Sequence, residues 1–168
     1  MEFKEWFKEK VSIVDEYLGQ IIEAKENPQK IIYQAVNYSL LSGGKRLRPV
    51  LFLGAYELFS DDLKKALPFA CIMEMIHTYS LIHDDLPAMD NDDYRRGKLS
   101  NHKKFGEARA ILAGDALLNK AFETGLDAAI NFKGMNAIKA LKLIADSSGT
   151  EGMIGGQVID IDGENKIS

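Results

Sequence analysis

Hydrophobic residues recur at intervals of three and four along the first part of the chain. In residues 2–24 this spacing places one apolar stripe along a helix, formed by Phe3, Trp6, Phe7, Val11, Val14, Leu18, Ile21 and Ile22. A second amphipathic stretch follows, for which Asn27 can serve as the N-cap and Pro28 as the first helical residue. Gly43 and Gly44 then predict the end of that helix.

Two later segments are apolar on every side instead of along one stripe. Residues 49–59 and residues 67–82 each carry a single glutamate and no other acidic or basic residue apart from His77. A helix that is hydrophobic all round is a buried one, so these segments predict the core helices. We expect Pro68 in the first turn of its helix, because in a helix interior proline costs about 3 kcal/mol.

The rest of the chain continues the helical pattern through residues 106–126 and 134–157. A sustained alternation of apolar and polar residues, which would predict a strand, is found nowhere in the sequence. No repeat, low-complexity tract or Pro/Ser-rich linker marks a boundary. The pattern therefore predicts an all-α fold, organised as a single domain over residues 1–168.

Composition narrows the classes of protein. With 46% hydrophobic residues, the chain can bury a substantial core. Its net charge of -4 excludes a nucleic-acid surface, because binding to a phosphate backbone needs a clustered basic excess. The longest apolar run, PVLFLGAY, is too short to cross a bilayer, and the start of the chain lacks the pattern of a secretory signal. We expect a cytoplasmic protein without a membrane span.

Five carboxylates directly follow the second core segment, in the stretch HDDLPAMDNDD, and these are Asp84, Asp85, Asp90, Asp92 and Asp93. Two carboxylates about 6 Å apart repel by nearly 3 kcal/mol at an effective dielectric of about 20, so a cleft holding all of them would need cations. Pro87 disfavours helical geometry at the residue before it, so the chain can fold back and bring Asp90 near Asp84. Such oxygen ligands suit Mg²⁺, which keeps several waters and borrows ligands from substrate phosphates. An exposed loop screened by water is the alternative.

A calcium loop fails on spacing. Counting from Asp90, an EF-hand needs an oxygen ligand where Tyr94 stands, a glycine where Arg95 stands and a glutamate where Asn101 stands. Magnesium is therefore the preferred cation for this stretch.

Two groups of cations accompany the acids. Arg95 and Arg96 follow them at once and carry planar, permanently charged forks that suit diphosphate oxygens. Lys45, Arg46 and Arg48 follow the paired glycines at the expected start of a helix, where free backbone N–H groups also favour an anion. Taken alone, Lys45 and Arg48 could be solvated helix-start residues, and His77, two turns before Asp84, could be an ordinary core histidine.

The motifs GGKRLRP, IHTYSLIHDDLPAMDNDDYRRGK, HKKFGEARAILAGDALL and GGQVIDID occur in this order from about Asn27 onward. Together they resemble the trans-type polyprenyl diphosphate synthase family, and within it the bacterial farnesyl diphosphate synthases. The resemblance implies an isoprenoid-synthase-type all-α bundle around a central cavity, in a homodimer. It also implies a Mg²⁺-dependent prenyltransferase that condenses isopentenyl diphosphate with dimethylallyl or geranyl diphosphate to give farnesyl diphosphate.

The resemblance also implies roles for individual residues. Asp84 and Asp90 would bind Mg²⁺, with Asp85 in support, and Arg95 would contact the allylic diphosphate. The diphosphate of isopentenyl diphosphate would be bound by Lys45, Arg48, His77 and Arg96. Gln157 would lie along the allylic substrate. Tyr79 would limit the product to the farnesyl length, although five helical residues turn it about 140° from Asp84, which also fits an ordinary core residue.

The chain departs from the family in length. Family members are nearly twice as long and carry a second aspartate-rich motif with a Lys-Thr pair upstream of it, and neither is found here. We therefore expect an N-terminal portion of a synthase domain, inactive on its own. A geranylgeranyl diphosphate synthase and a non-catalytic partner subunit are the alternatives, and a Mg²⁺-dependent phosphohydrolase is a third.

Overall fold

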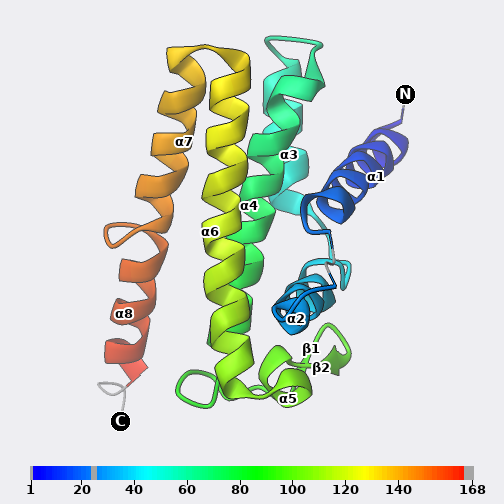
Figure 1. The fold of residues 1–168 in the computed structure, drawn as a ribbon. Helices are drawn as coiled ribbons and strands as arrows, with labels where there is room; N and C mark the ends of the chain where they lie inside the picture. The colour runs from blue at the N-terminus through cyan, green and yellow to red at the C-terminus, as the bar shows by residue number, and fades with distance from the viewer. Residues whose placement is uncertain (1, 24–25, 165–168) are drawn as a thin grey trace. The chain divides into compact units, whose positions relative to one another are not determined.

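The computed structural model describes residues 2–23 and 26–164. Helices make up 74% of it, which confirms the all-α prediction. Figure 1 shows the elements, which in chain order are α1 (Phe3–Ile21), α2 (Lys30–Leu40), α3 (Leu47–Glu57), α4 (Leu63–Asp84), β1 (Tyr94–Arg95), β2 (Lys98–Leu99), α5 (Asn101–Phe105), α6 (Glu107–Phe132), α7 (Met135–Ser148) and α8 (Met153–Glu164). The predicted first helix thus ends three residues before Ala24, which lies outside the described residues.

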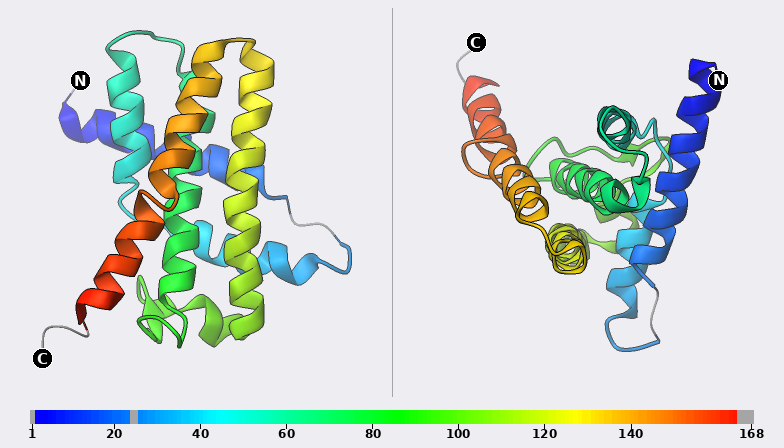
Figure 2. Two further views of the ribbon diagram at one scale, coloured as in Figure 1. Left: turned by 90° about the vertical axis from the view of Figure 1, so that its left-hand side faces the viewer. Right: turned by 90° about the horizontal axis from the view of Figure 1, so that it is seen from above.

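The chain divides into two compact units, Met1–Gly125 and Leu126–Ser168. The expectation of one domain over residues 1–168 stays a prediction. In the first unit α3 and α4 pack along each other, as both views in Figure 2 show, and α1 contacts both of these helices. The side chains buried on α4 lie all round it, as expected of a core helix, and include Phe69, Ile72, Met75, Ile76 and Ile82.

Helix α4 begins earlier than its apolar pattern indicates. It starts at Leu63, after Asp62, so Pro68 is its sixth residue and lies inside the helix. The prediction that Pro68 occupies the first turn is wrong. Proline there removes one backbone hydrogen bond, and the extensive burial of α4 offsets that loss.

A short antiparallel hairpin lies between α4 and α5. Tyr94 pairs with Leu99 and Arg95 with Lys98, and the two turn residues, Arg96 and Gly97, have φ of 53° and 76°. Positive φ at both central positions is typical of the type I′ turn, whose twist suits a two-residue hairpin. Strands of two residues are too short to produce an alternating pattern, which explains why the sequence did not predict them.

Helix α6 meets the end of α4 closely within the first unit. Nε2 of His83 lies 3.1 Å from the carbonyl oxygen of Ile111, and the imidazole rests directly against Gly114. A side chain at position 114 would collide with this ring, so the glycine permits the approach of the two helices.

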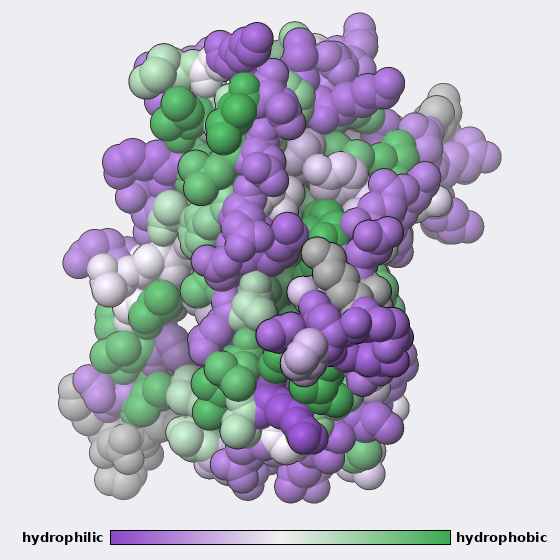
Figure 3. Space-filling view, viewed as in Figure 1, coloured by the Kyte–Doolittle hydropathy of each residue, from purple (hydrophilic) through white to green (hydrophobic). Residues whose placement is uncertain are grey.

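The second unit holds the end of α6 together with α7 and α8, which contact each other. The segment predicted as helical over residues 134–157 is two helices, because the backbone turns at residues 149–152 and Gly149 and Gly152 provide N–H groups for that turn. On the face shown in Figure 3, hydrophobic side chains interrupt a largely hydrophilic surface. Within residues 2–23 and 26–164, none of the helices has the length and apolar character that crossing a membrane requires.

Candidate functional site

The acidic stretch folds back on the end of α4. Asp84 is the last residue of that helix, and the backbone N–H of Asp90 donates to the Asp84 carbonyl oxygen at 2.9 Å. The N–H of Asn91 closes the same loop on the carbonyl of Leu86, at 3.1 Å. The predicted return of the chain after Pro87 is therefore confirmed.

The two carboxylates of this loop affect each other. Burial and, after it, the negative charge of Asp90 raise the pKa of the Asp84 carboxyl. Asp84 is half-buried and Asp90 is exposed, so the pair borders solvent. Oxygen donors that repel each other at a solvent border are suited to a hard cation such as Mg²⁺. In the part of the chain that the structure describes, no three His, Cys, Asp or Glu side chains converge on one metal position.

Asp85 faces inward, away from this border. It is 2% exposed, and its Oδ1 accepts a hydrogen bond from Nε of Arg95 at 2.8 Å. The same oxygen also forms an ion pair with Nη2 of Arg95. Nη2 of Arg95 also lies 3.0 Å from Asp92. The hydrogen bond that Arg95 donates to Asp85 raises the pKa of Arg95. Asp85 therefore orients the arginine expected to contact the allylic diphosphate. Asp92 and Asp93 complete the loop, and Asp93 forms an ion pair with Lys103 at 2.7 Å.

A pocket of about 530 Å³ lies beside α4, two turns from the acids. It brings together all four residues predicted to bind the second diphosphate, and its lining is Ser42, Gly44, Lys45, Arg46, Leu47, Arg48, Glu74, His77 and Arg96. Lys45 and Arg48 are exposed and flank the first turn of α3, as predicted. Burial and, next, the charge of Arg48 lower the pKa of His77, so its imidazole is neutral at pH 7. We call this cavity the cationic pocket.

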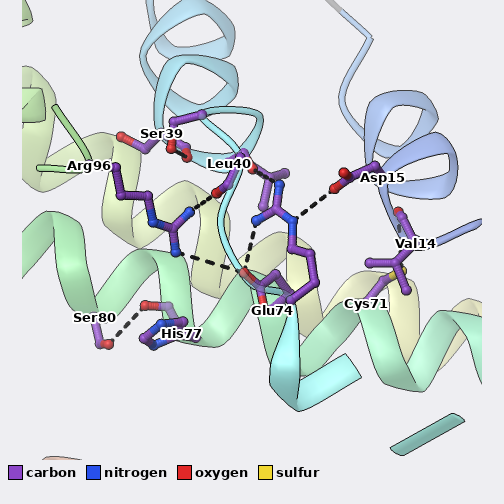
Figure 4. Close-up of polar contacts among 12 residues, drawn as sticks. Val14, Asp15, Ser39, Leu40, Cys71, Glu74, His77, Ser80 and Arg96 are labelled. Atoms are coloured by element: carbon purple, nitrogen blue, oxygen red, sulfur yellow. Dashed lines mark hydrogen bonds and ion pairs between the residues drawn. The ribbon is translucent and has the colours of Figure 1, made fainter. Parts of the chain in front are cut away.

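Arg46 differs from the two cations beside it in sequence. It is 3% exposed, and its backbone is left-handed with φ 49°. Its guanidinium reaches three segments, with Nε donating to Asp15, Nη1 to Glu74 and Nη2 to the carbonyl of Leu40, each at 2.8 Å. These three partners are labelled in Figure 4. Burial would lower its pKa, but the bonds to Glu74 and Asp15 raise it. Sequence reasoning grouped Arg46 with Lys45 and Arg48 as candidate anion-binding residues and missed this structural role, because its partners are distant in sequence.

Arg96 enters the pocket from the hairpin turn. Its Nη1 donates to the carbonyl oxygen of Gly43, and its Nη2 lies 3.9 Å from Oε1 of Glu74 (Figure 4). Gly44 has φ 136°, and a Cβ there would lie 2.8 Å from Cζ of Arg96. Helix α2 ends at Leu40, three residues before the predicted Gly43, and the role of Gly44 is to leave room for this guanidinium.

Two predicted residues stand apart from these groups. Tyr79 is buried on α4, with its ring edge-on to His83 at 5.7 Å between centroids, one turn before Asp84. Burial and then the charge of Asp84 raise the pKa of its hydroxyl. Gln157 is half-buried on α8, in the second unit, and its role stays a prediction.

The hairpin is held by buried polar residues that the sequence did not single out. Nδ2 of Asn101 donates to the Ala35 carbonyl and to Oγ of Ser39, both at 2.8 Å. The hydroxyl of Tyr38 lies 2.9 Å from the Leu99 carbonyl. These bonds tie the hairpin to α2 and so hold the two arginines between the acidic loop and the cationic pocket.

The chain is similar in sequence to known proteins. Residues 29–168 match the family of polyprenyl synthetases. The chain is 49% identical over 163 residues to a farnesyl diphosphate synthase of Micrococcus luteus, covering 95% of this chain and 55% of that protein. It is 50% identical over 158 residues to a geranylgeranyl diphosphate synthase of Cyanophora paradoxa, covering 94% of this chain and 52% of that protein.

A solved structure extends the likeness to the fold. The apo crystal structure of an FPP/GFPP synthase from Zymomonas mobilis superposes with a TM-score of 0.93 at 39% identity, over 98% of this chain and 59% of that one. The chain thus spans about half the length of the curated relatives that it matches. The match over residues 29–168, the level of identity and the shared all-α fold agree, and the chain belongs to the polyprenyl synthetase family.

Proposed function

We propose that the protein carrying these residues is a Mg²⁺-dependent prenyltransferase, which condenses isopentenyl diphosphate with dimethylallyl or geranyl diphosphate to give farnesyl diphosphate. One observation carries the proposal. Helix α4 contributes Asp84 to the acidic pair and His77 to the cationic pocket, and of the adjacent Arg95 and Arg96 one lies beside the acids and the other lines the pocket. A reaction between two diphosphate esters needs two anion sites of this kind at a short separation.

The acidic pair is the proposed metal site. Asp84 and Asp90 would hold Mg²⁺, which when bound supplies positive charge to the diphosphate that leaves the allylic substrate. Arg95 adds a fixed positive charge to the same diphosphate. Its position is held by Asp85 and Asp92, so it needs little reorganisation as negative charge develops on the leaving group.

The cationic pocket is the proposed site for isopentenyl diphosphate. Lys45, Arg48 and Arg96 supply positive charge for its diphosphate, and the neutral His77 can donate one hydrogen bond. This substrate keeps its diphosphate throughout the reaction. The pocket therefore has to bind and orient the substrate without stabilising a leaving group, which fits a site built from cations and without the acidic pair.

The proposed reaction needs no covalent intermediate with the protein. The allylic carbon–oxygen bond breaks, and its electron pair leaves with the diphosphate. The double bond of isopentenyl diphosphate attacks the allylic cation and forms the new carbon–carbon bond. A proton is then lost from the product, and the departed diphosphate accepts it. The residues of the site act by orienting two substrates and by stabilising charge.

Product length is the finer part of the proposal. Tyr79 is a bulky buried group one turn before Asp84, where a growing chain would pass below the metal site. This supports a farnesyl product, and relatives of the chain carry both farnesyl and geranylgeranyl names. We also expect a homodimer of the full-length protein, with exposed apolar residues of α6 such as Ile111 and Leu112 available for a second copy, and a cytoplasmic location.

The test is an assay of the full-length protein with isopentenyl diphosphate and geranyl diphosphate, with and without Mg²⁺, and mass analysis of the prenyl products. We expect a fifteen-carbon diphosphate and one pyrophosphate released per condensation. A twenty-carbon product would support the geranylgeranyl alternative. Release of inorganic phosphate without chain growth would support a phosphohydrolase, and an inactive protein that binds an active synthase would support a partner subunit.

A further inference from the structure

Glu74 is a buried carboxylate between two guanidinium groups (Figure 4). It lies on α4 and is 2% exposed. Arg46 donates to its Oε1 at 2.8 Å, and Nη2 of Arg96 lies 3.9 Å from the same oxygen. A single oxygen atom therefore links an arginine of the protein interior to an arginine of the cationic pocket.

The interior side of this link is fixed. Arg46 is also bonded to Asp15 and to the carbonyl of Leu40, so each of its three nitrogens has a partner from a different segment. A guanidinium held in this way cannot turn without losing charge-assisted hydrogen bonds in a buried setting. Arg46 thereby fixes the position of the Glu74 carboxylate.

The pocket side is not fixed in the same way. Arg96 is carried by a two-residue turn, and its side chain is 24% exposed. Its other recorded partner is the carbonyl oxygen of Gly43, which lies in a loop next to another glycine. Among the described residues, Glu74 is the carboxylate paired with this arginine. A long, flexible side chain on a turn needs such a partner to stay in one orientation.

We propose that Glu74 is a positioning residue, which holds the Arg96 guanidinium at the wall of the cationic pocket and so sets the affinity of the pocket for a diphosphate group. Glu74 does this without attracting the substrate, since it is itself an anion. The inference rests on the proposed function in one respect, because it takes isopentenyl diphosphate as the occupant of this pocket.

Replacing Glu74 has two consequences, which act in opposite directions on the binding of an anion in the pocket. Removing its negative charge makes the pocket more cationic, which by charge alone would strengthen the binding of an anion. Removing the anchor frees Arg96, which weakens binding. We expect the second effect to dominate, because Arg46 keeps Asp15 as a counter-charge at 2.8 Å, which limits the positive charge that the pocket gains, whereas Arg96 loses the carboxylate that orients it.

The experiment compares three variants of the full-length protein. Glu74→Gln keeps the shape and removes the charge, whereas Glu74→Asp keeps the charge and shortens the reach toward Arg96. Asp15→Asn is the matched control, because Asp15 bonds to Arg46 and has no recorded contact with Arg96. Binding of inorganic pyrophosphate and of isopentenyl diphosphate is measured by calorimetry without Mg²⁺ at 0.15 M salt, and folding is checked by circular dichroism and thermal unfolding.

We expect both Glu74 variants to bind the two ligands about tenfold more weakly than the wild type, and Asp15→Asn to change binding less than about twofold. In turnover, the KM for isopentenyl diphosphate should rise by a similar factor, while kcat and the KM for geranyl diphosphate change less than about twofold. In an Arg96→Gln background, adding Glu74→Gln should weaken binding by less than about twofold, because the residue it positions is already absent.

Four results would overturn the inference. Binding in Glu74→Gln that equals or exceeds the wild type would show that charge, and not position, is what Glu74 supplies. Wild-type binding in Glu74→Asp would show the same. Equal losses in Glu74→Gln and Asp15→Asn would assign Glu74 a structural role only. A wild-type protein that binds neither ligand would overturn the proposed function, and the inference with it.

Discussion

The acidic loop, residues 84–93, begins at the end of α4, two turns beyond His77 of the cationic pocket. The two regions differ in how their charges are balanced. In the acidic loop Asp84 and Asp90 repel each other at the solvent border, and the nearby Arg95 is already paired with Asp85 and Asp92. In the cationic pocket a buried carboxylate, Glu74, is built in among the arginines. The pocket therefore carries its own counter-charge, whereas the acidic pair is the proposed site for an external cation.

This difference predicts whether a substitution in each region affects activity or folding. Substitutions of Asp84 or Asp90 should affect activity more than folding, because these two carboxylates repel each other in the folded protein. The cationic pocket should be sensitive in folding, since each member of its buried ion pair depends on the other. Four changes, described in order of decreasing effect, test this difference.

Replacing Asp84 with alanine should have the largest effect. We expect kcat/KM with isopentenyl and geranyl diphosphates to fall about a thousandfold, which is about 4 kcal/mol of transition-state stabilisation. Thermal stability without Mg²⁺ should not decrease, because the change removes a repulsion with Asp90. Asp93→Asn is the control, since Asp93 pairs with Lys103 outside the pair. A variant that keeps wild-type Mg²⁺-dependent activity would refute the metal site.

Replacing Arg46 with methionine should damage folding instead. The change leaves the Glu74 charge buried with its nearest partner removed, and we expect the free energy of unfolding to fall by about 3 kcal/mol in urea denaturation. The double variant Arg46→Met/Glu74→Gln should recover part of this loss. Arg48→Met, on the exposed side of the same segment, should change stability by less than about 0.5 kcal/mol. Equal losses for Arg46 and Arg48 would contradict the comparison.

Replacing Gly44 with alanine tests the space beside Arg96. The new Cβ would lie 2.8 Å from Cζ of that arginine and should displace it. We expect the KM for isopentenyl diphosphate to rise about tenfold, with the KM for geranyl diphosphate changed less than about twofold. Gly43→Ala is the matched control, because that position also has positive φ but its Cβ would meet open space. If both variants behave alike, backbone strain and not contact with Arg96 is responsible.

The smallest effect concerns His77. Its pKa is lowered in the folded protein, so the unfolded chain binds more protons as the pH falls through about 6.5, and stability is lost in that direction. Between pH 7.5 and 5.5 we expect the melting temperature of the wild type to fall more than that of His77→Gln, by about 1–2 °C. Parallel curves for the two proteins would show that the surrounding cations do not control this histidine.

The sequence predicted the parts of the site that depend on local geometry. Pro87 indicated the turn after α4, and the return of Asp90 to Asp84 follows from it. The glycines before Lys45 indicated the start of a helix, which α3 provides. Such inferences need only the preferences of a few neighbouring residues.

The parts that the sequence did not predict depend on distant contacts. Adjacent residues with the same charge behave differently, since Asp84 borders solvent and Asp85 faces Arg95 inside the protein. Arg46 and Lys45 differ in the same way, because Arg46 meets Glu74 and Lys45 remains exposed. One residue along a helix or loop turns a side chain to another face, and only the packed structure decides which face is buried.

The bonds of Arg46 also have a consequence for local unfolding. They join residues that are 31 and 28 positions apart in sequence, from α1 to α4, across one guanidinium. Opening of α1 therefore removes one of the anchors beneath the cationic pocket, although none of the described residues of α1 lines it. Hydrogen exchange should show α1 and the loop after α2 opening as one cooperative unit. The first helix would thus contribute to the order of that loop, which carries Lys45 and Arg46.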